Sequence, residues 1–305
     1  MLLAQWRRTI GERSVSKAKS TSICYLANAI DLLTVFSAIN THFLTTLPVV
    51  QLRAPTQPPS PLQHWQLQIL LRHPGYDDGS NVLFKLQASD TDDHGQPGLL
   101  IQFAIDACAI IAGDFASGRG WLSLSRDGSA SIDPTSTLRE RSYYFHLDAA
   151  DDPYPIVLNF RQWKYPHERL PYWQQLAPDR NLASSSVAQV VPQWELDWWK
   201  ANGMSRYNTG STASLDDMAN ALLLPTDLQI AFDKPRIALV PKPATDGSMR
   251  LVAHLLENSP ELEHLYHNRE LHPTAVGVDM LYARFAWSVF TYSTSSAAGT
   301  NMAQT

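Results

Sequence analysis

Histidines are the side chains of this sequence whose type and spacing could hold a metal ion. His254, His264, His267 and His272 gather toward the C-terminal end. His264 and His267 lie three residues apart in a predicted helix, which is a spacing that can bind a metal. The only two cysteines, Cys24 and Cys108, do not complete such a site, and no fourth ligand is suitably spaced. Two interpretations remain: a metal site, or the favoured one, histidines on a helix surface and in packing contacts.

Side-chain amides recur in three motifs between residues 187 and 233. Gln189, Asn220 and Gln229 occupy, in turn, Ala188-Gln189-Val190-Val191-Pro192, Asp217-Met218-Ala219-Asn220-Ala221-Leu222-Leu223-Leu224 and Asp227-Leu228-Gln229-Ile230-Ala231-Phe232-Asp233. An amide takes up no proton near neutral pH, so it cannot act as a general base. Its carbonyl oxygen is a poor ligand for Mg²⁺ or Ca²⁺ and does not match imidazole for zinc or nickel.

In their order these motifs resemble the HNH nuclease domain of many fungal proteins. That family reads roughly Ala-His-Ile-Val-Pro, Asp-x-x-Asn-x-x-x-Leu and Asp-Leu-His-x-x-Phe-Asp. The resemblance implies that Gln189 stands at the general-base position, Asn220 at the position that braces the loop between two strands, and Gln229 at the metal-ligand position. It extends over roughly residues 80–290, and further matching segments are Trp198-Trp199, Asn202-Gly203-Met204, Val240-Pro241-Lys242 and Tyr266-His267-Asn268.

The resemblance implies an α+β protein. Its core near 187–233 would be a ββα-metal (His-Me finger) HNH-like unit with flanking strands and helices, preceded by a small mixed α/β module. By descent the function would be a metal-dependent endonuclease that hydrolyses phosphodiester bonds. With both motif histidines replaced by glutamine, we expect a degenerate, inactive site and no cofactor. Mg²⁺ or Zn²⁺ is expected only if the site keeps residual function. The alternative is a non-catalytic module that binds protein or nucleic acid.

Charge bears on the choice of partner, which is either DNA or another protein, with no small-molecule substrate evident. The net charge is −5, and residues 151–290 hold twelve Lys and Arg against sixteen Asp and Glu. A general DNA-binding domain would be basic. Arg161, Lys164 and Arg169 nevertheless interleave with Phe160, Trp163 and Tyr165. This pattern fits either a grip on a phosphate backbone with stacked bases, or a packing segment with solvated charges.

The chain is predicted to divide into four parts. Residues 1–61 form a basic and apolar tail ending in a proline-rich linker, 62–150 the small α/β module, 151–290 the nuclease-like domain and 291–305 a disordered tail. The basic start fits an untargeted tail or a mitochondrial presequence. A membrane anchor is disfavoured because Asn28 and Asp31 interrupt the apolar run. Two distant cysteines favour a reducing, intracellular compartment.

Overall fold

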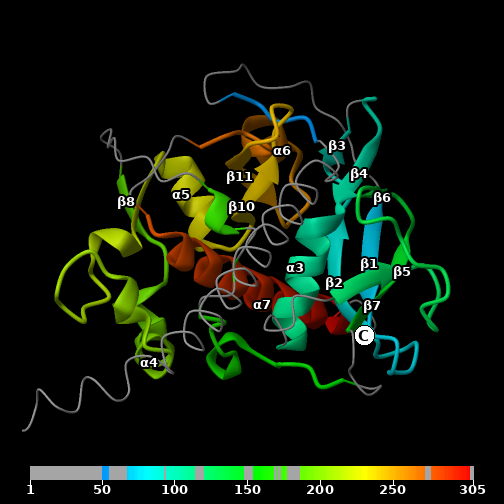
Figure 1. Cartoon of the computed structure of the whole chain (residues 1–305), viewed down its shortest axis with the longest axis horizontal. Coiled ribbons are helices and arrows are strands. Elements are labelled where there is room, and N and C mark those ends of the chain that lie inside the picture. Colours follow the sequence, from blue (N-terminus) through cyan, green and yellow to red (C-terminus); the bar gives the residue numbers. More distant parts are fainter. Residues whose placement is uncertain are drawn as a thin grey trace, which may run out of the picture. The chain divides into compact units, whose positions relative to one another are not determined.

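The computed structural model describes residues 50–54, 67–92, 94–113, 120–147, 154–167, 170, 173–176, 186–271 and 276–302. Residues 1–49 and 55–61 of the predicted tail and linker, Arg169 and His272 therefore lie outside the described residues. The chain divides into two units, Met1–Leu47 and Pro48–Thr305, and all described residues belong to the second. The second is a mixed α+β structure with small sheets, as the sequence predicts (Figure 1). Both predicted modules, 62–150 and 151–290, fall within this second unit.

The first half of this unit is built around a four-stranded sheet in the order β2-β1-β7-β5. Strand β1 pairs antiparallel with β2 and parallel with β7, and β5 pairs antiparallel with β7. A second sheet of three strands has the order β3-β4-β6, and its strands come between those of the first sheet along the sequence. The strands are β1 (Gln68–Arg72), β2 (Val82–Gln87), β3 (Asp90–Thr91), β4 (Pro97–Leu100), β5 (Gly120–Ser123), β6 (Thr137–Leu138) and β7 (Ser142–Leu147).

The alanine-rich helix α3 (Ile101–Ala112) packs against this half. It ends at Gly113, whose φ of 68° provides the left-handed C-cap that a residue with a Cβ adopts at a cost. Ten of its side chains are buried, because it lies between the sheet and the C-terminal helix α7. The sequence predicts this helix as buried over 99–112, and the structure confirms it with a start two residues later.

The second half holds two hairpin-like sheets and several short helices. Strand β8 pairs antiparallel with β9, and β10 with β11. The elements are η1 (Phe160–Gln162), η2 (Trp173–Gln175), β8 (Ser186–Gln189), η3 (Gln193–Glu195), α4 (Leu196–Ala201), η4 (Met204–Tyr207), η5 (Met218–Asn220), β9 (Ala221–Leu224), α5 (Thr226–Asp233), β10 (Ile237–Pro243), β11 (Met249–Leu255), α6 (Pro260–Tyr266) and α7 (Val278–Met302).

Helix α7 connects the two halves, as the long red helix in Figure 1 shows. It packs against β10, α3 and β2. It continues to Met302, past residue 291, where the sequence predicts a disordered tail to begin. The hydroxyls of Thr291 and Ser293 donate to the carbonyls of Trp287 (2.8 Å) and Phe290 (2.9 Å), so they are satisfied within the helix. The ring of Tyr292 also meets Phe84 of β2, at 5.5 Å between centroids.

Residues 50–54 lie within the predicted tail, yet they form isolated β-bridges with segments from both halves. Val50 forms an antiparallel bridge with Asp92, and Arg53 a parallel bridge with Arg269. The buried Arg53 guanidinium donates to the carbonyls of His267 (2.9 Å), His264 (2.8 Å) and Glu263 (3.2 Å). A cation at these carbonyls stabilises the C-terminal end of α6. This segment is therefore an integral part of the second unit.

Candidate functional site

The three amide motifs converge on one strand pair and the helix after it. Strand β8 runs antiparallel to β9 with Gln189 opposite Ala221, and α5 follows β9 after Pro225. Ala188, Leu222 and Leu224 are buried, which fixes the register of the pair because a shift by one residue would expose them. Leu228 and Phe232 bury the inner face of α5. The helix packs against both β8 and β10.

Asn220 ties the two ends of the connection between these strands together. Its Oδ1 accepts from the Val191 amide at 2.7 Å, and its Nδ2 donates to the carbonyls of Val191 and Leu215, both at 3.1 Å. Its own carbonyl accepts from the Val190 amide at 2.9 Å. The side chain is 1% exposed. Every one of these hydrogen bonds replaces a contact with water, so Asn220 holds the loop in a single conformation.

Gln189 is half-buried at the end of β8. Its Nε2 donates to Asp216 Oδ1 at 2.8 Å and to Gln193 Oε1 at 3.2 Å. Gln229 is also half-buried, in the second turn of α5 between the buried Leu228 and the exposed Ile230. Neither amide can accept a proton at neutral pH, so the structure supplies no general base at these positions.

The residues around Gln189 and Gln229 do not fit a divalent metal ion. Among the described residues, one group of His, Cys, Asp or Glu side chains has three ligand atoms within 4.8 Å of one another, and it lies elsewhere, at Asp90, His254 and His267. Two amide oxygens, with the Asp216 carboxylate beside Gln189, are a weak donor set compared with the three protein ligands of a catalytic zinc site. We therefore derive no metal-assisted step for this chain.

A buried cation behind the strand pair adds to this mismatch. Arg284 of α7 donates to the carbonyl of Val190, next to Gln189, at 3.3 Å, and to the carbonyl of Phe232. Its guanidinium carbon lies 3.8 Å from the Phe232 ring centre and 4.2 Å from that of Trp287. Burial lowers the pKa of Arg284 to about 9, partly opposed by the charge of Asp233. The side chain stays charged at neutral pH, which disfavours a second cation close by.

The candidate phosphate-binding segment is a packing segment where the structure describes it. Phe160, Trp163 and Tyr165 are at most 4% exposed, whereas stacking on bases needs exposed rings. Arg161 and Lys164 are exposed, and Arg161 forms an ion pair with Glu195 at 3.2 Å. The aromatic side chains thus serve the core around α7, with Phe160 4.2 Å from Trp198 between ring centroids.

The candidate metal-binding histidines separate into two environments. His264 lies on α6, while His267 caps the C-terminal end of that helix and turns into the interior. There it meets His254 of β11 and Asp90 of β3, which sequence spacing did not suggest. Asp90 is more than 150 residues from either histidine in the chain. Lys242 and His267 stand in two segments that match the family resemblance, Val240-Pro241-Lys242 and Tyr266-His267-Asn268, but no local pattern links either of them to Asp90.

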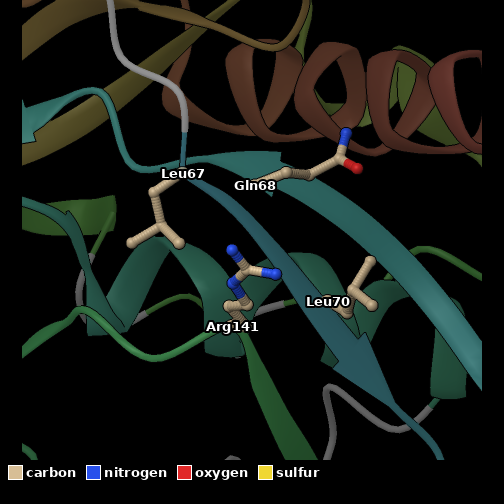
Figure 2. Close-up of a pocket in the computed structure, with 4 residues that line it drawn as sticks. All are labelled: Leu67, Gln68, Leu70 and Arg141. Atoms are coloured by element: carbon tan, nitrogen blue, oxygen red, sulfur yellow. The ribbon is translucent and has the colours of Figure 1, made fainter.

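A pocket at the start of β1 is separate from both sites. It has a volume of about 450 Å³ and is lined by Leu67, Gln68, Leu70 and Arg141. Figure 2 shows the Arg141 side chain between Leu67 and Leu70, with Gln68 directed away from them. One exposed guanidinium without a nucleophile, acid or base beside it provides binding contacts only.

Comparisons of the chain with protein-family models, with curated proteins and with solved structures find no match. In the part of the chain that the structure describes, no helix has the length and apolar character to cross a membrane.

Proposed function

We propose that residues 187–233 form an HNH-type ββα unit that has lost its general base and its metal ligand, and that the protein uses it as a non-catalytic interaction module. The observation that carries the proposal is the arrangement of β8, β9 and α5 around Asn220. Two antiparallel strands and a helix occur in the family's order, and the asparagine of the second motif makes the bracing hydrogen bonds that the family expects of it.

The loss of catalysis follows from the side chains that accompany this brace. Gln189 and Gln229 provide amides where the chemistry needs imidazoles. The loss of a general base alone typically removes about 10²–10⁴ in rate. The loss of a metal ligand compounds it, because a hydrolytic metal site relies on its full ligand set to fix the ion. The positive charge of Arg284, which donates to the Val190 carbonyl, also disfavours a metal ion close by.

A protein partner is favoured over nucleic acid. Residues 151–290 carry a net charge of −4, from twelve basic and sixteen acidic side chains. Three of the six large apolar side chains that are more than a third exposed in the described residues belong to 187–233, namely Trp194 (61%), Met218 (55%) and Ile230 (54%). Exposed aromatic and methionine side chains are enriched at protein interfaces, whereas phosphate backbones attract basic surfaces.

A gain-of-function experiment tests the geometry. In the double variant Gln189→His/Gln229→His, two imidazoles replace weak amide ligands, and calorimetry should detect Ni²⁺ or Zn²⁺ binding that the wild type lacks. Asp216, 2.8 Å from the Gln189 amide, can accept a hydrogen bond from the new imidazole and orient it. Gln189→Asn/Gln229→Asn is the matched control, and each single histidine variant should gain little.

Two outcomes would contradict the proposal. If the double histidine variant binds metal no better than the double asparagine variant, the ββα unit does not have HNH geometry. If wild-type protein nicks plasmid DNA with Mg²⁺, Mn²⁺ or Ni²⁺, and Gln189→Ala/Gln229→Ala abolishes the nicking, the unit is an active enzyme. A gel-shift series over salt concentration tests the choice of partner: binding that weakens steeply with salt would indicate phosphate contacts.

A further inference from the structure

Five polar side chains are buried together at the junction between the two halves of the compact unit. Asp90 comes from β3, Lys242 from β10, His254 from β11, and His267 and Asn268 from the turn after α6. Asp90, Lys242 and His254 are wholly inaccessible to solvent, and His267 and Asn268 are 6% and 4% exposed. Buried charges are costly unless they are paired and hydrogen-bonded, so this cluster needs a specific arrangement to persist.

The ammonium group of Lys242 lies at its centre. Its Nζ contacts Asp90 Oδ1, Asn268 Oδ1 at 2.6 Å and His254 Nδ1 at 2.7 Å. An ammonium has three N–H donors and no acceptor, so these three acceptors match it completely. Acceptance at His254 Nδ1 requires that ring to be neutral, with its proton on Nε2.

The remaining bonds fix the protons of the other groups. The Leu255 amide donates to His267 Nδ1 at 3.2 Å, so the proton of that neutral ring is on Nε2, which faces Asp90 Oδ1 at 3.2 Å. Asn268 Nδ2 donates to the same oxygen at 3.0 Å. Asp90 Oδ2 accepts from the Leu100 amide at 2.8 Å. The carboxylate thus has partners on both oxygens.

The charge states agree with this pattern. Burial alone would raise the pKa of Asp90, but the ammonium of Lys242 and the hydrogen bond from His267 hold that pKa well below its usual value. Burial and the charge of Lys242 lower the pKa of His254 well below its usual value. Burial also lowers the pKa of Lys242, opposed by the charge and hydrogen bond of Asp90, and burial lowers the pKa of His267. The pattern of donors and acceptors fits one carboxylate, one ammonium and two neutral imidazoles.

This pattern argues against a metal ion at Asp90, His254 and His267. A metal would need the Nε2 lone pair of His267, yet the Leu255 amide directs the ring's proton to that atom. It would also have to displace the Lys242 ammonium, whose Nζ is within hydrogen-bonding distance of both Asp90 and His254. Two groups would have to rearrange inside a closed core before an ion could bind.

We propose that Asp90, His254 and Asn268 form a binding site for a primary ammonium ion. His267 orients the carboxylate of Asp90, and the ammonium group of Lys242, which is part of the chain itself, occupies the site. The site joins Asp90 of the first half to four side chains of the second half. It is independent of the proposed interaction module, because none of its residues contributes to β8, β9 or α5.

Chemical rescue tests the ligand class. Lys242→Ala removes Cγ, Cδ, Cε and Nζ, which are the heavy atoms of n-propylammonium. Thermal denaturation of this variant should show a lowered Tm that n-propylammonium chloride raises in a saturable way, because a ligand of the folded state stabilises it by mass action. Tetramethylammonium chloride and sodium chloride at equal concentration should not reproduce the effect, since neither offers N–H donors. The wild type and the exposed-lysine variant Lys234→Ala are the matched controls, and neither should respond.

If Lys242→Ala does not fold unaided, its refolding yield is compared with and without n-propylammonium. A higher yield with propylammonium than with tetramethylammonium supports the site, and equal yields overturn it. The proposal is also overturned if Zn²⁺ or Co²⁺ raises the wild-type Tm, EDTA lowers it, and His254→Gln removes both responses, because the cluster would then be a metal site. Wild-type protein that is indifferent to metal and to EDTA is the expected result.

Discussion

Replacing Asn220 with alanine should destabilise the protein strongly. The change leaves the Val191 amide and the carbonyls of Val191 and Leu215 without their side-chain partner in a buried place. An unsatisfied buried polar group costs about 1–3 kcal/mol, and relaxation of the loop toward water recovers part of this cost. We expect a loss of about 3–5 kcal/mol in the free energy of unfolding, a large share of the roughly 5–15 kcal/mol typical of a domain.

Urea denaturation at neutral pH measures this loss. Asn208→Ala is the matched control, because Asn208 also donates two hydrogen bonds to loop carbonyls, at Thr212 (2.8 Å) and Ser214 (2.7 Å), but in a solvent-exposed loop. Water replaces those bonds, so its cost should stay below about 1 kcal/mol. A loss for Asn220→Ala no greater than for Asn208→Ala would refute the view that Asn220 braces the loop.

Three further experiments probe the core. Burial raises the pKa of Asp106 to about 7, so the folded state binds its proton more tightly than the unfolded state. Its contribution to stability is therefore present near pH 4 and is lost as pH rises to about 7, and the wild-type minus Asp106→Asn difference in unfolding free energy should fall by about 4 kcal/mol over that range in pH-dependent urea titrations. A pH-independent difference would contradict the raised pKa. The Cys108 thiol is buried, and burial raises its pKa, so a thiol reagent should label it only after unfolding. Rapid labelling of native protein would show that α3 opens readily. In Gly120→Ala a Cβ would lie 2.2 Å from the Phe145 ring, so we expect a loss of about 1–3 kcal/mol by calorimetry. Gly79→Ala, with nothing within 4 Å, should be neutral, and equal effects at both positions would rule out the clash.

Local sequence patterns predict most elements of the second half. The Asp246-Gly247 turn predicts the β10–β11 hairpin, and Ser259 with Pro260 predicts the start of α6. The spacing of Ile237, Leu239 and Pro241 predicts a strand over 236–242 with one apolar face, but every residue of β10 is buried. Apolar and polar residues alternate along a strand only when one face of the strand is exposed to solvent. Strand β10 instead contacts helix α7 and pairs with β11.

Local sequence patterns do not predict the buried cluster of Asp90, Lys242, His254, His267 and Asn268. His264 and His267 share a predicted helix, but the helix ends at Tyr266. The backbone of His267 is extended, and its side chain is buried. Asp90 and Lys242 are 152 residues apart, and no sequence pattern near either residue predicts that the two side chains form an ion pair. Such pairs depend on tertiary packing. In a single sequence, the sign of such packing is a polar residue at a position where an apolar residue is expected.

The short segment at residues 50–54 has a consequence for the order in which the chain folds. Arg53 donates its amide to the Asn268 carbonyl, and the Glu270 amide donates to the Arg53 carbonyl, across more than 200 residues of chain. Contacts of such high sequence separation carry a large loop-closure entropy and slow folding. During synthesis Arg53 is made more than 200 residues before its backbone partners Asn268 and Glu270. The last turn of α6, which Arg53 caps, therefore completes its folding only after translation has passed Glu270.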